Sequence, residues 1–207
     1  MKRVVSLLFI CAFFMSAFAQ KSEEKLVRKA FDNYKTAVLN KQGEQAVNYV
    51  SAKTIDYYSN MLELVKTADS TTIDRLQLMD KLMVLTVRLR IPKEEILKFD
   101  GKSFLEYGIS NGMIGNIANF SIGDVKITGD TAKGQFMVGK EKAPFYYDFY
   151  KENGQWKIDL TSILAISETA FSAMIQESGQ TENEILLLLL EKIAGAKPDN
   201  TMWQPIL

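Results

Sequence analysis

The sequence lacks histidine altogether and holds a single cysteine, Cys11. Without an imidazole, the chain cannot form a Ser-His-Asp or Cys-His catalytic group. The same absences exclude zinc sites built from histidine and cysteine, haem held by either residue, and thiol redox chemistry beyond position 11. Any catalysis would therefore rely on Asp, Glu, Lys or Tyr as acid, base or nucleophile.

Cofactor motifs and an excess of one charge are also missing. The phosphate-binding patterns of P-loop and dinucleotide-binding proteins are absent, as is the Asp-rich calcium loop of EF-hands. We therefore expect no cofactor and no metal. Basic and acidic residues number 25 each, so the chain has no net field that would attract nucleic acid.

The first 19 residues have the pattern of a secretory signal peptide. Lys2 and Arg3 precede an apolar run from Val4 to Met15, and Ser16–Ala19 places small residues where a signal peptidase reads them. We expect cleavage before Gln20 and export by a Sec-type route to the periplasm or the medium. The released protein would then contain no thiol.

Two other interpretations of this segment are weaker. A membrane anchor needs roughly 20 apolar residues, which is longer than this run, so we expect no membrane span in the released chain. A lipoprotein would carry its lipid on Cys11, but the residue before a lipidated cysteine is normally small, and here it is Ile10.

Helical periodicity dominates the first half of the chain and its end. N-terminal capping is expected at Ser22, at Thr71 with Asp74, at Asp100 or Ser103, at Ser167, and at Thr181 with Glu184. The predicted helices cover residues 22–39, 44–50, 54–67, 71–89, 93–99, 100–111, 167–178 and 181–194. The 71–89 segment is apolar on more than one side, which indicates deep burial or a protein interface. The apolar run Ile185–Leu190 indicates burial against the domain, or alternatively a dimer or partner contact.

A period of two replaces the helical pattern between residues 119 and 161. Gly129–Asp130 and Asn153–Gly154 mark hairpin turns between apolar-alternating runs. These signals predict a four-stranded antiparallel meander. The fold class is therefore α+β, with N-terminal helices packed on the sheet and further helices at the C-terminal end.

Residues 23–60 and 119–161 together resemble the NTF2-like (cystatin-like α+β) superfamily. There, a long and a short helix precede a Tyr- or Phe-rich segment, and the closing strand has the form G-x-W-K-I, as in Gly154–Ile158. The resemblance implies a curved sheet that forms a cone-shaped cavity. It also implies a domain over residues 20–164, with a helical insertion near 70–112 and a helical extension over 165–207. Both additions could cover the mouth of the cone.

The alternation within the strands predicts which side chains face inward. We expect the inward set to line a pocket: Tyr34, Tyr58, Phe104, Tyr147 and Trp156. The simpler interpretation of this set is an aromatic core. Phe145 is expected to share the inward face of Tyr147, while Asp148 and Asp159 should point away from it. The opposite face exposes Met137, Tyr146 and Tyr150, which suggests an interface between two copies of the chain.

Three functions remain open at this stage. The first is non-enzymatic binding of a small apolar ligand or a protein partner, because the inward face is apolar and lacks an obvious acid or base. The second is a lyase or isomerase that uses Asp and Tyr. The resemblance implies this alternative, because enzymes of that fold often use such residues. The third is a structural or interaction role in the cell envelope through Leu186–Leu190.

Overall fold

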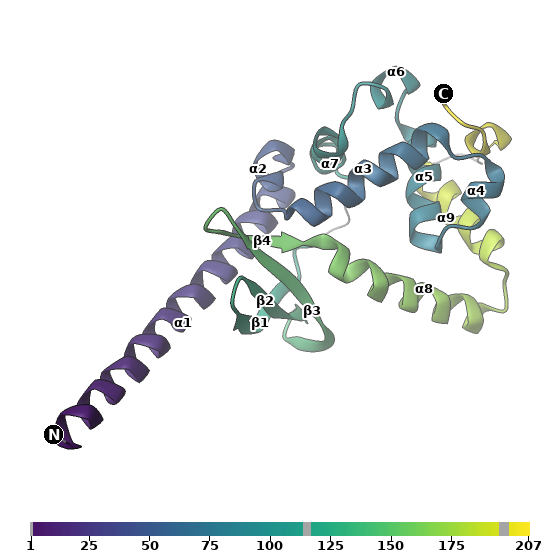
Figure 1. Cartoon of the computed structure of the whole chain (residues 1–207). Helices are drawn as coiled ribbons and strands as arrows, with labels where there is room; N and C mark the ends of the chain where they lie inside the picture. The colour runs from purple at the N-terminus through teal and green to yellow at the C-terminus, as the bar shows by residue number, and fades with distance from the viewer. Residues whose placement is uncertain (1, 114–116, 195–198) are drawn as a thin grey trace.

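The computed structural model describes residues 2–113, 117–194 and 199–207, with an α+β architecture (Figure 1). Helices make up the N-terminal and the C-terminal parts of the chain, and the strands lie between them in the sequence. The helices are α1 (Lys2–Leu39), α2 (Gly43–Val47), α3 (Ala52–Thr67), α4 (Ser70–Asp74), α5 (Leu78–Arg90), α6 (Lys93–Ile96), α7 (Gly101–Ser110), α8 (Leu164–Ser178) and α9 (Glu182–Ala194), with short 3-10 turns η1 (Leu160–Ile163) and η2 (Asn200–Trp203). Within these described residues, no helix is both long and apolar enough to cross a membrane.

The sheet is an open antiparallel meander, as the sequence predicts. Its strands are β1 (Phe120–Thr128), β2 (Thr131–Val138), β3 (Glu141–Glu152) and β4 (Gln155–Asp159), in the spatial order β1-β2-β3-β4. Asn153 and Gly154 both have positive φ, at 50° and 78°, and this backbone suits a tight two-residue hairpin. The β2–β3 register shifts between Gln135 and Met137.

One core forms where α1 crosses the sheet. The apolar stripe of α1, which includes Phe31 and Tyr34, packs with Phe149, Trp156 and Ile158. At the edge, Arg28 and Lys35 donate hydrogen bonds to the β1 carbonyls of Ile122 and Phe120, at 3.0 and 2.7 Å. These contacts fix the part of α1 that follows residue 19 against β1.

A second core is built from helices alone. Residues of α3, α5 and α9 meet in it, among them Leu62, Val65, Leu85, Leu186 and Leu190. The leucine run of α9 is divided between two environments: Leu186 and Leu190 are fully buried, whereas Leu187 and Leu188 are exposed. The packing of the run against the domain thus uses one face of the helix only.

Two expected helix starts differ from those in the structure. Ser22 does not begin a helix, because α1 continues without a break through that position. No Gly or Pro interrupts the chain there, so the preceding segment continues as helix. Ser167 lies inside α8 rather than at its start, because the turn η1 after β4 already leads into the helix; its hydroxyl donates to the carbonyl of Ile163.

The predicted single helix over 71–89 is two helices. Asp69, rather than Thr71, caps α4 by accepting a hydrogen bond from the Thr72 amide at 2.8 Å. The helix ends after α4, and a new helix, α5, begins at Leu78. The carboxylate of Glu168 on α8 accepts hydrogen bonds from the amides of Leu78 and Met79, at 3.2 and 3.1 Å. This distant carboxylate satisfies two of the free amides at the start of α5.

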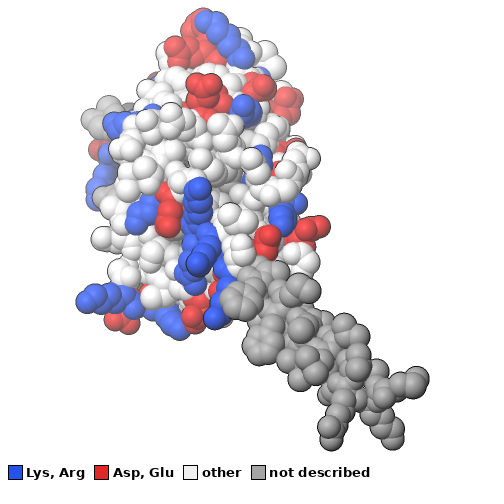
Figure 2. All heavy atoms as spheres, turned by 90° about the vertical axis from the view of Figure 1, so that its left-hand side faces the viewer, with Lys and Arg blue, Asp and Glu red and all other residues white. Residues whose placement is uncertain are grey.

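The charge pattern of the surface agrees with the balanced composition. Acidic and basic side chains are interspersed over the face seen in Figure 2, so this face carries no extended field of one sign.

Candidate functional site

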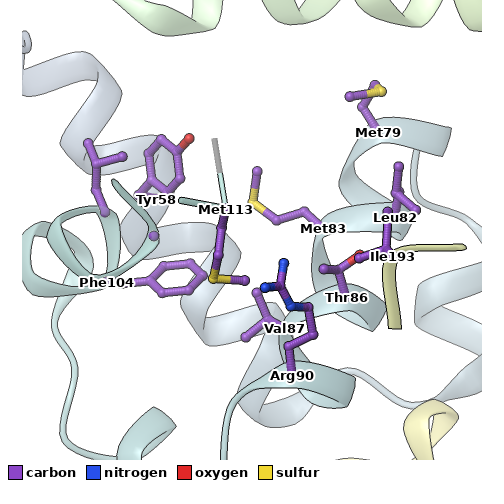
Figure 3. Close-up of a pocket in the computed structure, with 12 residues that line it drawn as sticks. Tyr58, Met79, Leu82, Met83, Thr86, Val87, Arg90, Phe104, Met113 and Ile193 are labelled. Atoms are coloured by element: carbon purple, nitrogen blue, oxygen red, sulfur yellow. The ribbon is translucent and has the colours of Figure 1, made fainter. Parts of the chain in front are cut away.

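A cavity of about 270 Å³ lies between α3, α5, α7 and the end of α9 (Figure 3). Its wall is mainly apolar, with three methionines. The lining residues are Tyr58, Met79, Leu82, Met83, Thr86, Val87, Arg90, Phe104, Leu105, Gly108, Met113 and Ile193. Concave, mostly apolar sites with a few polar groups are the usual form of small-molecule sites.

Helix α5 supplies half of this wall from one stripe. Met79, Met83, Thr86 and Arg90 recur at steps of three and four residues, so they share one face of the helix. The opposite side of α5 carries Leu85, which is fully buried in the helical core. The two apolar sides of this segment therefore have different surroundings. One side packs in the helical core, and the other lines the cavity.

Two polar groups of α5 interrupt the apolar wall. The hydroxyl of Thr86 is buried and has no hydrogen-bond partner among the described residues. The guanidinium of Arg90 points into the cavity toward Met83 and Met113 (Figure 3). Arg90 itself is solvent-exposed, so it marks the mouth of the cavity. It forms no ion pair with any described residue.

The unpaired hydroxyl of Thr86 leads to a prediction about the stability of the fold. Replacing Thr86 with valine keeps the branched shape and removes a buried polar atom without a partner. We expect Thr86→Val to raise the free energy of unfolding by about 1 kcal/mol, measured by urea denaturation. Thr86→Ser, which keeps the hydroxyl and loses the methyl group, should not be stabilising. A destabilised valine variant would mean that the hydroxyl is bonded in solution.

The five side chains predicted to line one pocket lie in two places. Tyr58 and Phe104 line the cavity, and their rings are 6.0 Å apart between centroids. Burial raises the pKa of Tyr58 to about 12, so its hydroxyl stays protonated at neutral pH. Tyr34, Tyr147 and Trp156 belong to the other core, under the sheet. There the Trp156 indole donates to the carboxylate of Glu23 at 2.6 Å.

The predicted interface face of the sheet is only partly exposed. Tyr146 is 46% exposed, whereas Met137 and Tyr150 are half-buried. The ammonium of Lys53 lies 5.9 Å from the centre of the Tyr150 ring and covers part of that face. Phe145, expected on the inward face, is half-buried close to the β2–β3 register shift and belongs to neither core cluster.

Asp159 was expected to point away from the inward face, but its side chain does not reach the surface. Its side chain does point away from Ile158, but the start of α3 covers it completely. The carboxylate accepts hydrogen bonds from Thr54 at 3.2 Å, Lys53 at 2.9 Å, and the amide and hydroxyl of Thr161 at 2.9 and 2.7 Å. These bonds make Asp159 a structural link between α3 and β4.

Carboxylates are missing from the cavity itself. No Asp or Glu is among the described residues that line it. Tyr57 donates a 2.6 Å hydrogen bond to Asp80, but neither side chain belongs to the lining. In the described part of the chain, no three acidic side chains come together as metal ligands would. The described lining residues can thus contact and orient a molecule, but they supply no carboxylate to it.

Sequence reasoning missed the methionines and Arg90 as site residues. Their helical spacing on α5 was visible, but a core face and a cavity wall have the same spacing. Comparison with known proteins adds no further information on the site: no protein-family model, curated protein or solved structure matches the chain.

Proposed function

We propose that this chain is an exported, non-enzymatic protein that binds a small apolar ligand in the cavity between α3, α5, α7 and α9. The observation that carries the proposal is the wall itself, which is apolar and holds Met79, Met83 and Met113. Methionine side chains are flexible and polarisable, so they adapt to ligands of varied shape. The signal-like segment over residues 1–19 supports the export part of the proposal.

We also propose an NTF2-like origin for the α+β part of the chain. Its support is the order of elements, with α1 and α2 before a four-stranded meander whose last strand contains Trp156. In such an ancestor the ligand space would lie under the sheet. Here aromatic rings occupy that region, where Phe31 and Phe136 pack against Tyr147 at 5.3 and 5.1 Å between centroids. The binding space would then have moved to the added helices.

Gly108 allows a direct test of the binding proposal. It lies inside α7 and lines the cavity, and a Cβ atom built on it meets no atom within 4 Å. Gly108→Leu should fill the cavity without disturbing packing. With 1-nonanol as probe in isothermal titration calorimetry, we expect the parent protein to bind and the leucine variant to bind at least about tenfold more weakly.

The matched control is Gly108→Ala. Its small side chain leaves most of the cavity open, and an alanine inside a helix is favoured over glycine by about 0.5–1 kcal/mol. This variant should therefore bind nonanol nearly as the parent does and unfold at higher denaturant concentration. The proposal fails if the parent binds no nonanol, or if the leucine and alanine variants bind it equally well.

A further inference from the structure

We infer that the natural ligand is a single-chain amphiphile with one anionic head group, held at Arg90, and a hydrocarbon chain of roughly nine carbons among the methionines. The inference rests on the proposed function, because it specifies what the same cavity binds. Its basis is the distribution of charge, hydrogen-bonding groups and space in the cavity, and each contributes separately.

Charge specifies the head group. Arg90 is the only charged residue among the described lining residues. It forms no ion pair with another described residue, and its guanidinium points toward the cavity (Figure 3). A guanidinium presents several donors in a planar fork that matches a carboxylate, sulfate or phosphate oxygen pair. A cationic head group would be repelled there, and a neutral one would form no charge-assisted hydrogen bond with the guanidinium through a charge of its own.

The hydroxyl of Thr86 favours the same orientation. Thr86 lies one helical turn before Arg90 on the same face of α5, and its buried oxygen has no hydrogen-bond partner among the described residues. The Thr86 hydroxyl can donate a hydrogen bond to an anionic oxygen that Arg90 binds at the mouth of the cavity. Buried polar groups without partners are costly, so one inside an apolar wall is well explained by a bond that forms only with a ligand.

Space limits the chain length. A volume of about 270 Å³ is near the lower end of the usual range of ligand sites, roughly 300–1,000 Å³. If each methylene fills about the volume of one water molecule in the liquid, roughly 30 Å³, the cavity holds about nine carbons. The remaining wall, from Met79 to Ile193, offers no polar group along that path except Thr86 and the Tyr58 hydroxyl.

The test uses three probes with the same nine-carbon chain and different head groups. Nonanoate, 1-nonanol and nonylamine are titrated into the purified protein at pH 8, where the first is an anion and the last a cation. We expect nonanoate to bind about fivefold or more tightly than 1-nonanol, and nonylamine to bind most weakly. The preference for nonanoate should shrink as salt concentration rises.

The decisive variant is Arg90→Gln, with Arg90→Lys as its charge-retaining control. Arg90→Gln should lose about fivefold in nonanoate affinity and so remove the preference for nonanoate over 1-nonanol, while Arg90→Lys should retain part of the preference. If 1-nonanol and nonanoate bind the parent equally, or if Arg90→Gln weakens both alike, the head-group inference is wrong and the cavity proposal stands. If no probe binds the parent, the proposed function itself fails. Tightest binding of nonylamine would overturn the inference outright.

Discussion

Replacing Arg88 with alanine is expected to lower the free energy of unfolding by about 3 kcal/mol, one of the two largest effects that we expect from any single change in this chain. The guanidinium of Arg88 bonds four backbone carbonyls. Nε donates to Val65 at 2.8 Å, Nη1 to Met202 at 3.1 Å, and Nη2 to Leu64 at 3.1 Å and Ala68 at 2.7 Å. It thus closes the C-terminal end of α3 and attaches the turn η2 to it.

The size of this effect follows from what the change leaves behind. Carbonyls at a helix end lack partners within the helix and must find them elsewhere; of the carbonyls that Arg88 bonds, that of Leu64 also accepts the Ala68 amide. Partial burial already lowers the pKa of Arg88, and the carbonyl bonds offset that loss of hydration. Alanine would remove the four donors at once and also the packing of the side-chain stem.

Urea denaturation at neutral pH tests the Arg88 prediction, with Arg88→Lys and Arg88→Met as controls. Lysine keeps the charge but cannot donate along the planar fork, so we expect it to recover less than half of the loss. Methionine keeps the stem and should resemble alanine more closely. A lysine variant as stable as the parent would show that charge alone, rather than the fork, stabilises this end of α3.

Replacing Asp159 with asparagine is the second large change, with an expected loss of about 2–3 kcal/mol. Its carboxylate accepts four hydrogen bonds, one of them from the Lys53 ammonium. An amide offers one accepting oxygen, and its NH₂ group would face the donors of Lys53 or Thr161. The ammonium of Lys53 is more than half exposed and returns to water, which keeps the loss below that of a fully buried ion pair.

The same carboxylate should make stability depend on pH. Burial by itself would raise the pKa of Asp159, but hydrogen bonds from Thr161 and Lys53 outweigh it and the pKa is lowered overall. Because the unfolded value is about 3.9, the carboxylate stabilises the fold above pH 4 and loses that contribution as pH falls through the folded pKa.

The pH prediction is checked by comparing two denaturation profiles. The parent should lose more stability than Asp159→Asn between pH 5 and pH 2, so the difference between them narrows as acid is added. Thr161→Val, which removes one donor and keeps the carboxylate, should show a smaller loss at neutral pH and retain the acid sensitivity. Parallel profiles for the parent and Asp159→Asn would contradict the assignment of this carboxylate.

Local signals predicted several elements whose stabilising partner is close in sequence. The cap at Asp100, one of two positions expected for it, and the capping box of Thr181 with Glu184 both form, because cap and partner lie three residues apart. The start of α5 was missed because its capping carboxylate, Glu168, comes from a position 90 residues away. The burial of Asp159 was missed for a similar reason, since strand alternation gives its direction but not the helix that covers it.

The candidate site shows the same limit. Tyr58 and Phe104 were predicted as pocket residues and line the cavity, but they were grouped with Tyr34 and Trp156, which lie under the sheet. Both sets are aromatic and inward-facing, so composition and period cannot separate them. Only the packing of α3 between the sheet and α5 places them in different surroundings.

By itself, the sequence determined the order and type of most elements and the chemistry that is excluded. Periodicity and caps act between neighbouring residues, and a missing imidazole is missing in any fold. The tertiary structure alone decided where space remains, because the cavity is the volume that side chains from four helices leave unfilled. It also decided that Arg90 faces this space rather than an acidic partner, since no local pattern records which distant groups approach a side chain.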